Sequence, residues 1–353
     1  LPEMNDHHSR LSGLKAAGIL LALGFAFAGD HAHAVEKGTY NLYLENDYFA
    51  GTDRYYTNGI KLGWSSVDLE EFRDTPLASP WLPIFNLLED EHLKAYQKNL
   101  IYVIGQNIYT PQNTETSEYV PDDRPYAGWL YTGVGVVWKN QRVRNTLLFH
   151  LGMVGPASMA KETQRMIHDL KNIEHPMGWE HQLHNEIGLV VAYERMWRWP
   201  PSPVKRLGLD WELLPHAGLV LGNVHCHANA GAELRAGINL PDDFGTAAIG
   251  PTASTSTPIG GDMKTSRALL DLGFHLFARV DGRAVARNIF LDGNTFDDSH
   301  SVERKVWVSD LSIGFVVTYK NTKLAYAHVS RTREYQVQEE PQKFGTITLS
   351  WAF

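Results

Sequence analysis

The sequence has few of the features that usually reveal a protein's class. Cys226 is the only cysteine among 353 residues, so an internal disulfide is impossible. It lies between His225 and His227, but this one cluster lacks the ligand number and spacing of a structural zinc site. The serine-nucleophile signature Gly-x-Ser-x-Gly is absent, which leaves little support for a serine hydrolase. The formal net charge of −8 gives no indication of a nucleic-acid partner.

The N-terminal residues 1–34 are predicted to be an export signal rather than part of the fold. Basic residues precede the apolar run Ile19–Ala28, and a small-residue cleavage pattern follows at Ala32–Ala34. The run is shorter than the ~20 apolar residues that span a bilayer, which disfavours the alternative of an uncleaved anchor. We expect the residues before Met4 to originate outside the gene and the mature protein to start near Val35. Residues 35–353 are then predicted to form one domain.

After Val35 there is no apolar stretch long enough for a transmembrane helix, so the exported chain is either soluble or a closed β-barrel. Several segments alternate between apolar and polar side chains, as membrane strands do. In the segment 270–280, for example, Leu272, Phe274 and Leu276 share one face, while Gly273 and His275 lie on the other. A soluble β-sandwich alternates in the same way, so these segments alone leave both alternatives open.

The last strand favours the barrel. Ile347, Leu349, Trp351 and the terminal Phe353 alternate with small or polar residues. This pattern resembles the C-terminal strand by which bacterial outer-membrane proteins are recognised, so we expect the barrel-assembly machinery as a partner. In a soluble protein so apolar an edge strand would invite aggregation. The sequence therefore predicts an integral protein of the bacterial outer membrane.

The alternating segments predict an all-β fold, a twelve-stranded antiparallel transmembrane β-barrel. An even number of strands places both ends of the mature chain in the periplasm. The links 140–143 and 320–323 then become tight periplasmic turns, whereas the links 68–97 and 241–266 are long for that side, and the first is expected to carry a helix. The strands are expected near residues 39–47, 57–67, 98–108, 127–139, 144–153, 186–196, 207–220, 228–238, 268–290, 306–319, 322–331 and 343–353.

Strand parity places the links after strands 1, 3 and 5 together on the extracellular rim, and these links carry the unusual polar clusters of the sequence. In the third link, Ser158 is expected to cap a short helix from Met159 to Leu170. Gln164 and His168 would share one face of this helix, with His168 held over the barrel mouth. A histidine is largely neutral at physiological pH and suits the general-base step of ester hydrolysis.

Simpler roles are open for these residues when the clusters are taken alone. An isolated loop histidine is usually solvated, and the chain has 16 histidines. Asp47 and Asp53 suit turns, because Asp commonly bonds nearby backbone in loops. Arg124 has Asp122 and Asp123 beside it as ion-pair partners, and Trp179 suits an aromatic girdle at the headgroup level.

These clusters resemble the outer-membrane lipid A 3'-O-deacylase family. Asn46 and Asp47 match at the end of the first strand, Thr57 matches at the start of the second, and His168 with Glu174 matches in the helical loop. The stretch from Gly155 to His168 and the step to Glu174 keep the family spacing. The resemblance covers nearly the whole mature chain, although the specific motifs occupy about a quarter of it.

The resemblance implies a Ca²⁺-dependent enzyme that removes the 3'-linked acyloxyacyl group from lipid A of lipopolysaccharide at the cell exterior. It implies that His168 activates water, that Asp47 and Glu174 help to bind the cation, and that Asn46 and Thr57 position substrate or water. We expect Arg124, Gln164 and Trp179 to bind substrate.

One position departs from the family pattern. A lysine expected after the third strand aligns near Thr116, which puts the identity of the substrate in question. An outer-membrane phospholipase and a non-catalytic barrel or channel are the alternative functions.

Overall fold

The computed structural model describes residues 38–47, 55–75, 81, 96–206, 209–246, 250–251, 258 and 272–352. The predicted export signal and Phe353 lie outside the described residues. Two α-helices are described, α3 (Ala160–Lys171) and α4 (Ile289–Asp292). The strands are β1 (Gly38–Asn46), β2 (Tyr55–Ser66), β3 (Gln97–Thr110), β4 (Ala127–Lys139), β5 (Val143–Val154), β6 (Glu186–Trp197), β7 (Trp199–Arg206), β8 (Leu209–Gly222), β9 (His225–Ile238), β10 (Leu272–Asn288), β11 (Trp307–Tyr319), β12 (Thr322–Arg331) and β13 (Gln342–Ala352).

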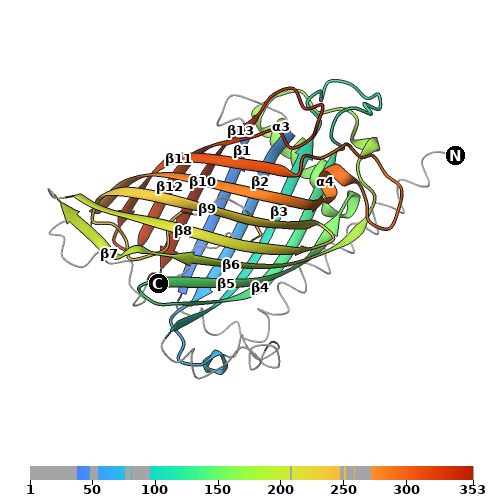
Figure 1. Cartoon of the computed structure of the whole chain (residues 1–353). Helices are drawn as coiled ribbons and strands as arrows, with labels where there is room; N and C mark the ends of the chain where they lie inside the picture. The colour runs from blue at the N-terminus through green and yellow to red at the C-terminus, as the bar shows by residue number, and fades with distance from the viewer. Residues whose placement is uncertain are drawn as a thin grey trace.

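The strands close into a barrel (Figure 1). Apart from β6 and β7, neighbours in sequence pair antiparallel. β1 pairs with β13, and β6 pairs with β8. The short β7 follows β6 after Arg198 and pairs with β8, so it prolongs this hairpin beyond the cylinder. Twelve strands therefore form the closed wall, and the predicted fold class, including a short helix in the link after the fifth strand, is confirmed.

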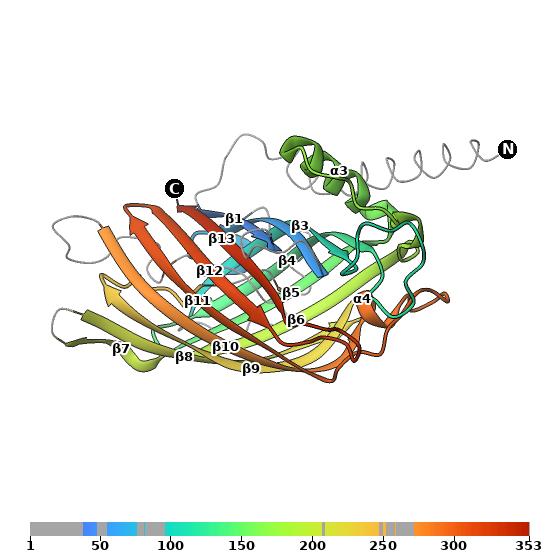
Figure 2. The ribbon, with the colours of Figure 1, turned by 90° about the horizontal axis from the view of Figure 1, so that it is seen from above.

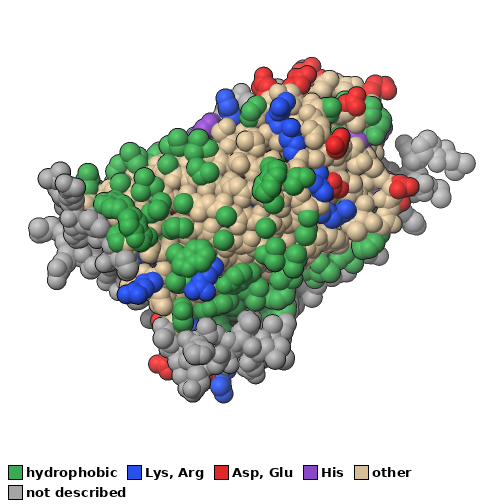
Figure 3. All heavy atoms as spheres, in the orientation of Figure 1, with side chains coloured by type: hydrophobic (Ala, Val, Ile, Leu, Met, Phe, Trp, Pro, Cys, Tyr) green, Lys and Arg blue, Asp and Glu red, His purple; other side chains and the backbone are tan. Residues whose placement is uncertain are grey.

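Alternation along each strand separates a lipid-facing surface from the lumen. On β10, Leu272, Phe274 and Leu276 are exposed on the outside, whereas His275 and Phe277 are buried inside. Apolar side chains gather over the outside of the wall (Figure 3). Among the described residues, no helix has both the length and the apolar character needed to cross a membrane. This outer surface is that of a barrel whose strands face hydrocarbon.

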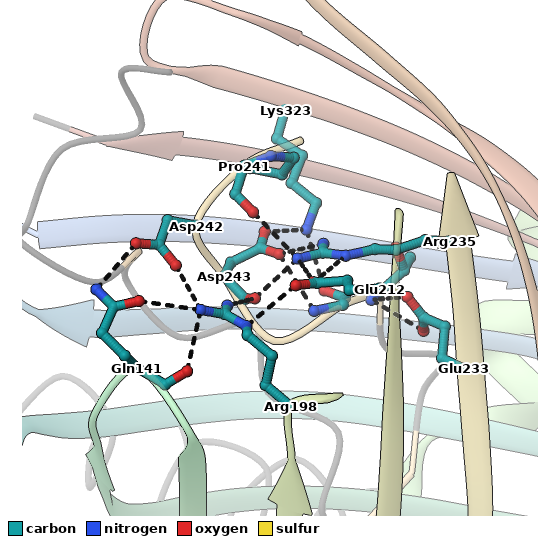
Figure 4. Close-up of polar contacts among 11 residues, drawn as sticks. Gln141, Arg198, Glu212, Glu233, Arg235, Pro241, Asp242, Asp243 and Lys323 are labelled. Atoms are coloured by element: carbon teal, nitrogen blue, oxygen red, sulfur yellow. Dashed lines mark hydrogen bonds and ion pairs between the residues drawn. The ribbon is translucent and has the colours of Figure 1, made fainter. Parts of the chain in front are cut away.

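The lumen is filled by charged groups near the end that carries the short turns (Figure 4). Arg235 contacts Glu212 and Asp243, and Lys323 lies 2.6 Å from Asp243. Arg198 contacts Glu212 at 3.1 Å. Because every one of these charges has an opposite partner, their burial costs far less than burial of single ions.

The long link after β9 enters the lumen at this end. Asp243 and Thr246 belong to this link and bond to Lys323 and to Glu233 of the wall, and Pro251 accepts a hydrogen bond from His150 Nε2 at 3.0 Å. Burial raises the pKa of Asp243, but Lys323 and Arg235 outweigh it and hold that pKa well below its usual range. The unusual length of this link is thus used to fill the barrel.

The link between β2 and β3 packs against the outside of the wall. Its described part includes a 3-10 turn, Phe72–Asp74. Residues 76–80 and 82–95 lie outside the described residues, so the helix expected in this link stays a prediction. Leu69 and Phe72 pack against Leu100 and Val136 of β3 and β4. The links 140–142 and 320–321 are tight turns, as predicted.

Candidate functional site

Two of the three predicted polar clusters come together at the barrel end opposite the short turns. The links after β3 and β5 are joined by backbone hydrogen bonds, Met177 N to Thr114 O at 2.8 Å and Leu183 N to Tyr126 O at 3.0 Å. Residues 48–54 of the first link lie outside the described residues. Thr116 is part of this contact, because Gly178 lies close to it. A Cβ added at Gly178 would be 3.0 Å from the Thr116 carbonyl oxygen. Thr116, the position at which the resemblance leads us to expect a lysine, therefore borders Gly178, the residue before Trp179.

Helix α3 begins after a tight 3-10 turn, Pro156–Ser158. The cap residue is Met159, whose backbone is left-handed, and no side chain caps the helix. Ser158 donates its hydroxyl to the Gly155 carbonyl at 2.6 Å instead. The prediction that Ser158 caps the helix is therefore wrong, because its hydroxyl closes the preceding turn.

The helix lies against the outside of the barrel wall and not over the mouth as predicted. Gln106 of β3 donates to the Ser158 carbonyl at 2.6 Å, and Gln106 is the register partner of Ile60, which faces lipid. A Cβ on Gly128 of β4 would clash with Ser158 and Ala160. In Figure 2, α3 lies outside the ring of strands, on the side of β1, β3 and β4. This placement puts the helix on the lipid side of the wall.

The wall-facing side of α3 carries the two residues that sequence periodicity placed together. Gln164 and His168 are both buried. Gln164 accepts a hydrogen bond from the Trp179 indole at 2.9 Å, and Trp179 packs against Tyr126 with ring centroids 4.9 Å apart. A buried indole usually finds such a partner, so this bond fixes Trp179 beside the helix.

A hydrogen bond to backbone determines which nitrogen of His168 carries the proton. The helix ends at Asn172, whose left-handed backbone turns the chain back toward His168. As a result, the carbonyl oxygen of Glu174 lies 2.5 Å from His168 Nδ1. A carbonyl only accepts, so Nδ1 donates and Nε2 holds the lone pair. A neutral histidine in this tautomer is suited to take a proton through Nε2.

Asn46 stands on the same outer face as this group. It pairs in register with Asn58, which in turn pairs with Ile108, and Ile108 packs against Ala160 and Trp179. Adjacent strands are ~4.8 Å apart, so two strand steps separate Asn46 from the covered position by roughly 10 Å. The pairing thus brings Asn46 near the edge of the helix.

The other predicted catalytic and metal-binding residues are only partly described. Asp47 is buried in the turn after β1. Thr57 lies at a register irregularity of β2, between Tyr56 and Asn58, and its side chain is not among those that the structure describes. The Glu174 side chain is exposed, and only its carbonyl contacts His168.

Carboxylate oxygens are ligands that Ca²⁺ prefers, so Asp47 and Glu174 fit the ion in kind. Within the described ranges, no group of three or more His, Cys, Asp or Glu side chains is arranged to hold a metal ion. This holds also for His225 and His227, which line a pocket in the lumen.

Arg124 lies on the other side of the wall. Its guanidinium stands over the Tyr109 ring, 4.9 Å from the centroid, and contacts Glu334 at 3.2 Å. Tyr109 follows Ile108 on β3, so the two side chains point to opposite faces. The structure therefore does not bring Arg124 together with His168, and its ion-pair partner is Glu334 in place of Asp122 or Asp123.

Gln106 is a residue of the site to which sequence reasoning assigned no role, although it begins the polar cluster after the third strand. It interrupts the outward-facing apolar series Leu100, Tyr102, Ile104 and Ile108, and this interruption is visible in the sequence. A polar residue at a lipid-facing position implies a cover, which α3 supplies.

The comparisons with known proteins agree with this architecture. The family model described as outer membrane protein LpxR matches residues 16–353. LpxR from Salmonella typhimurium is similar in structure, with a TM-score of 0.70 and 19% identity, over 89% of this chain and 100% of that chain. The β domain of the Bordetella autotransporter BrkA gives a TM-score of 0.44 and 8% identity, over 90% and 99% of the two chains.

The comparison with curated proteins gives no match. The resemblance noted in the sequence is confirmed by the family model, and the outer membrane is the location that the barrel and this family share. Because the match covers nearly all of the chain, the protein belongs to the LpxR family of outer-membrane proteins.

Proposed function

We propose that the protein is a lipid A deacylase that hydrolyses the 3'-linked acyloxyacyl ester of lipid A in the outer leaflet. Family membership supports the substrate class. The observation that carries the proposal is the hydrogen bond of His168 Nδ1 to the Glu174 carbonyl. It prepares Nε2 as a base on the lipid-facing side of the wall, where an ester in the leaflet is within reach.

The reaction begins when His168 Nε2 takes a proton from water and the resulting hydroxide attacks the ester carbonyl carbon. The tetrahedral intermediate then expels the sugar oxygen, which receives the proton back from the imidazolium. The Glu174 carbonyl stabilises the positive ring in between, because it accepts from Nδ1 in both charge states. Asn46 and Thr57 position water or the ester, and Gln164 with Trp179 lines the side of the helix that substrate meets.

Asp47 and Glu174 would hold a Ca²⁺ ion in this scheme. The bound ion would supply positive charge for the oxyanion that develops on the ester carbonyl. Removal of the ion with EGTA is expected to stop hydrolysis, and added Ca²⁺ is expected to restore it. Activity that persists in EGTA would exclude this role for the ion.

The decisive experiment is mass spectrometry of lipid A from cells that express the protein or its His168→Ala variant. Loss of a general base lowers the rate by about 10²–10⁴-fold, so the variant should leave lipid A intact. Heat-modifiable migration in gels serves as the control that the barrel has folded. Unchanged deacylation by a folded His168→Ala barrel would disprove the proposal.

The same preparation distinguishes the alternative functions. Release of fatty acid from phospholipid vesicles without lipid A would make the protein a phospholipase. A passive channel is disfavoured by the lumen, where Asp243 is held by Arg235 and Lys323 across the barrel. Ion conductance in planar bilayers that is independent of His168 would favour a channel instead.

A further inference from the structure

The surface of α3 is divided into three sides with different chemistry. An α-helix turns about 100° per residue, so residues four apart share a side. Gln164 and His168 face the wall. Met166 and Leu170 form a second, apolar side, and their exposed fractions are 57% and 81%. The third side carries two exposed charged residues four positions apart, Arg165 and Asp169.

Exposed apolar residues also follow the end of the helix. Ile173 and Met177 are exposed as well, so the apolar flank consists of Met166, Leu170, Ile173 and Met177. Single exposed apolar residues are common on proteins and need no explanation. Four within twelve residues are a local concentration, and exposed apolar surface that is concentrated in one place usually marks a contact with protein or membrane.

The helix stands directly on the lipid-facing belt of the barrel. Register pairing defines a row of outward side chains that crosses the wall beneath the helix, and Gln106 is the polar member of this row. Its neighbours on both sides are apolar. In order along the row the residues are Leu44, Ile60, Gln106, Leu130, Met153 and Ile187.

At Gln106, therefore, Ser158 and α3 cover the wall in place of lipid. Gln106 is buried because Ser158 and α3 lie over it, while Ile60 on the next strand remains exposed to lipid. The helix that carries the apolar flank thus stands on the belt at the level where the row is interrupted. A surface next to hydrocarbon on one side and apolar itself fits acyl chains as its occupant.

We propose that the apolar flank of α3 rests among the acyl chains of the outer leaflet, with its charged side turned to the headgroups and water. The helix then acts as an interfacial helix attached to the wall. A lipid substrate moves laterally from the bilayer to His168 and does not leave the membrane. The membrane contact rests on the fold and the outer-membrane location, whereas the substrate route rests on the proposed hydrolysis.

Labelled cysteine variants test the membrane contact directly. Leu170→Cys and the matched Asp169→Cys, each with Cys226→Ser, are labelled with an environment-sensitive fluorophore. Both are refolded into phosphatidylcholine vesicles with or without a nitroxide-labelled acyl chain. We expect the nitroxide to quench position 170 several-fold more than position 169, and aqueous iodide to quench position 169 several-fold more.

Two outcomes would overturn the proposal. Equal quenching by iodide at both positions would place the flank in water, and protection of position 170 from both quenchers would indicate a protein partner. Met166→Cys and Arg165→Cys form a second matched pair should the first not fold. The measurement repeated with His168→Ala gives the same quenching if the contact is independent of hydrolysis, so failure of the proposed reaction is recognised separately.

Discussion

The two polar regions of the molecule, the luminal network near the short turns and the group beneath α3, are built in opposite ways. Arg198, Glu212, Arg235, Asp243 and Lys323 are charged, buried and mutually neutralised. Beneath α3 the buried side chains are neutral amides and rings, and the one titratable group among Gln164, Trp179 and His168 has its tautomer set by backbone. Full pairing suits a structural role, whereas a histidine with a lone pair on Nε2 suits chemistry.

The largest effect is expected from Asp243→Asn. The substitution leaves the buried cations Arg235 and Lys323 without their shared carboxylate, and such a loss costs about 3–5 kcal/mol of unfolding free energy. Urea unfolding of the refolded barrel in detergent measures it. Deacylation per folded molecule should stay within about two-fold of the parent, because the two regions are separate. If stability and deacylation fell together, the distinction between the two regions would be wrong.

Lowering the pH tests the role of the luminal network further. The pKa of Asp243 is lowered in the folded state, so its contribution is present above the unfolded-state pKa of about 3.9 and fades as the pH falls below it toward the folded value. The stability difference between the parent and Asp243→Asn should therefore shrink between pH 5 and pH 2, in rough terms, as urea midpoints at several pH values will report. A stability difference that stays constant with pH would mean that Asp243→Asn destabilises the barrel for a reason other than the lost charge.

Trp179→Phe is expected to have a smaller effect on stability and a larger one on the reaction. It keeps an aromatic ring against Tyr126 but leaves the buried Gln164 oxygen without its donor, at a cost of about 1–3 kcal/mol. We expect deacylation to fall several-fold while the urea midpoint changes less than in Asp243→Asn. Trp307→Phe, on the exposed outside of β11, is the matched control.

The smallest effect is expected from Gln106→Leu. The change removes one hydrogen bond to Ser158, worth about 1 kcal/mol, and restores an apolar residue to the lipid-facing row. Deacylation should fall modestly through looser placement of α3, and hydrogen exchange of the helix should rise. An identical exchange pattern would show that packing on Gly128 alone holds the helix.

The sequence was most informative where a pattern has one structural solution. Alternation along the strands predicted the twelve-stranded wall, and the 3.6-residue period placed Gln164 and His168 on one side of a helix. It did not show that α3 packs on the outer face of β3, because that depends on Gln106 and Gly128 meeting Ser158, which follows Gln106 by 52 positions. The prediction of a helix cap at Ser158 was wrong for a related reason, because a serine hydroxyl can bond to backbone in a turn as readily as it can cap a helix.

Arg124 was misplaced because a loop residue between two strands can turn to either side of the wall. Its partner Glu334 lies 210 positions away and no local pattern indicates it. Contacts of this kind follow from closure of the barrel and not from neighbouring residues.

The pairing of Asp243 with Lys323 also restricts the order of assembly. These residues are 80 positions apart, and Lys323 lies at the start of β12. The bond between Asp243 and Lys323 cannot form until β12 has joined the sheet, so this part of the luminal network is completed only in the last stages of barrel closure.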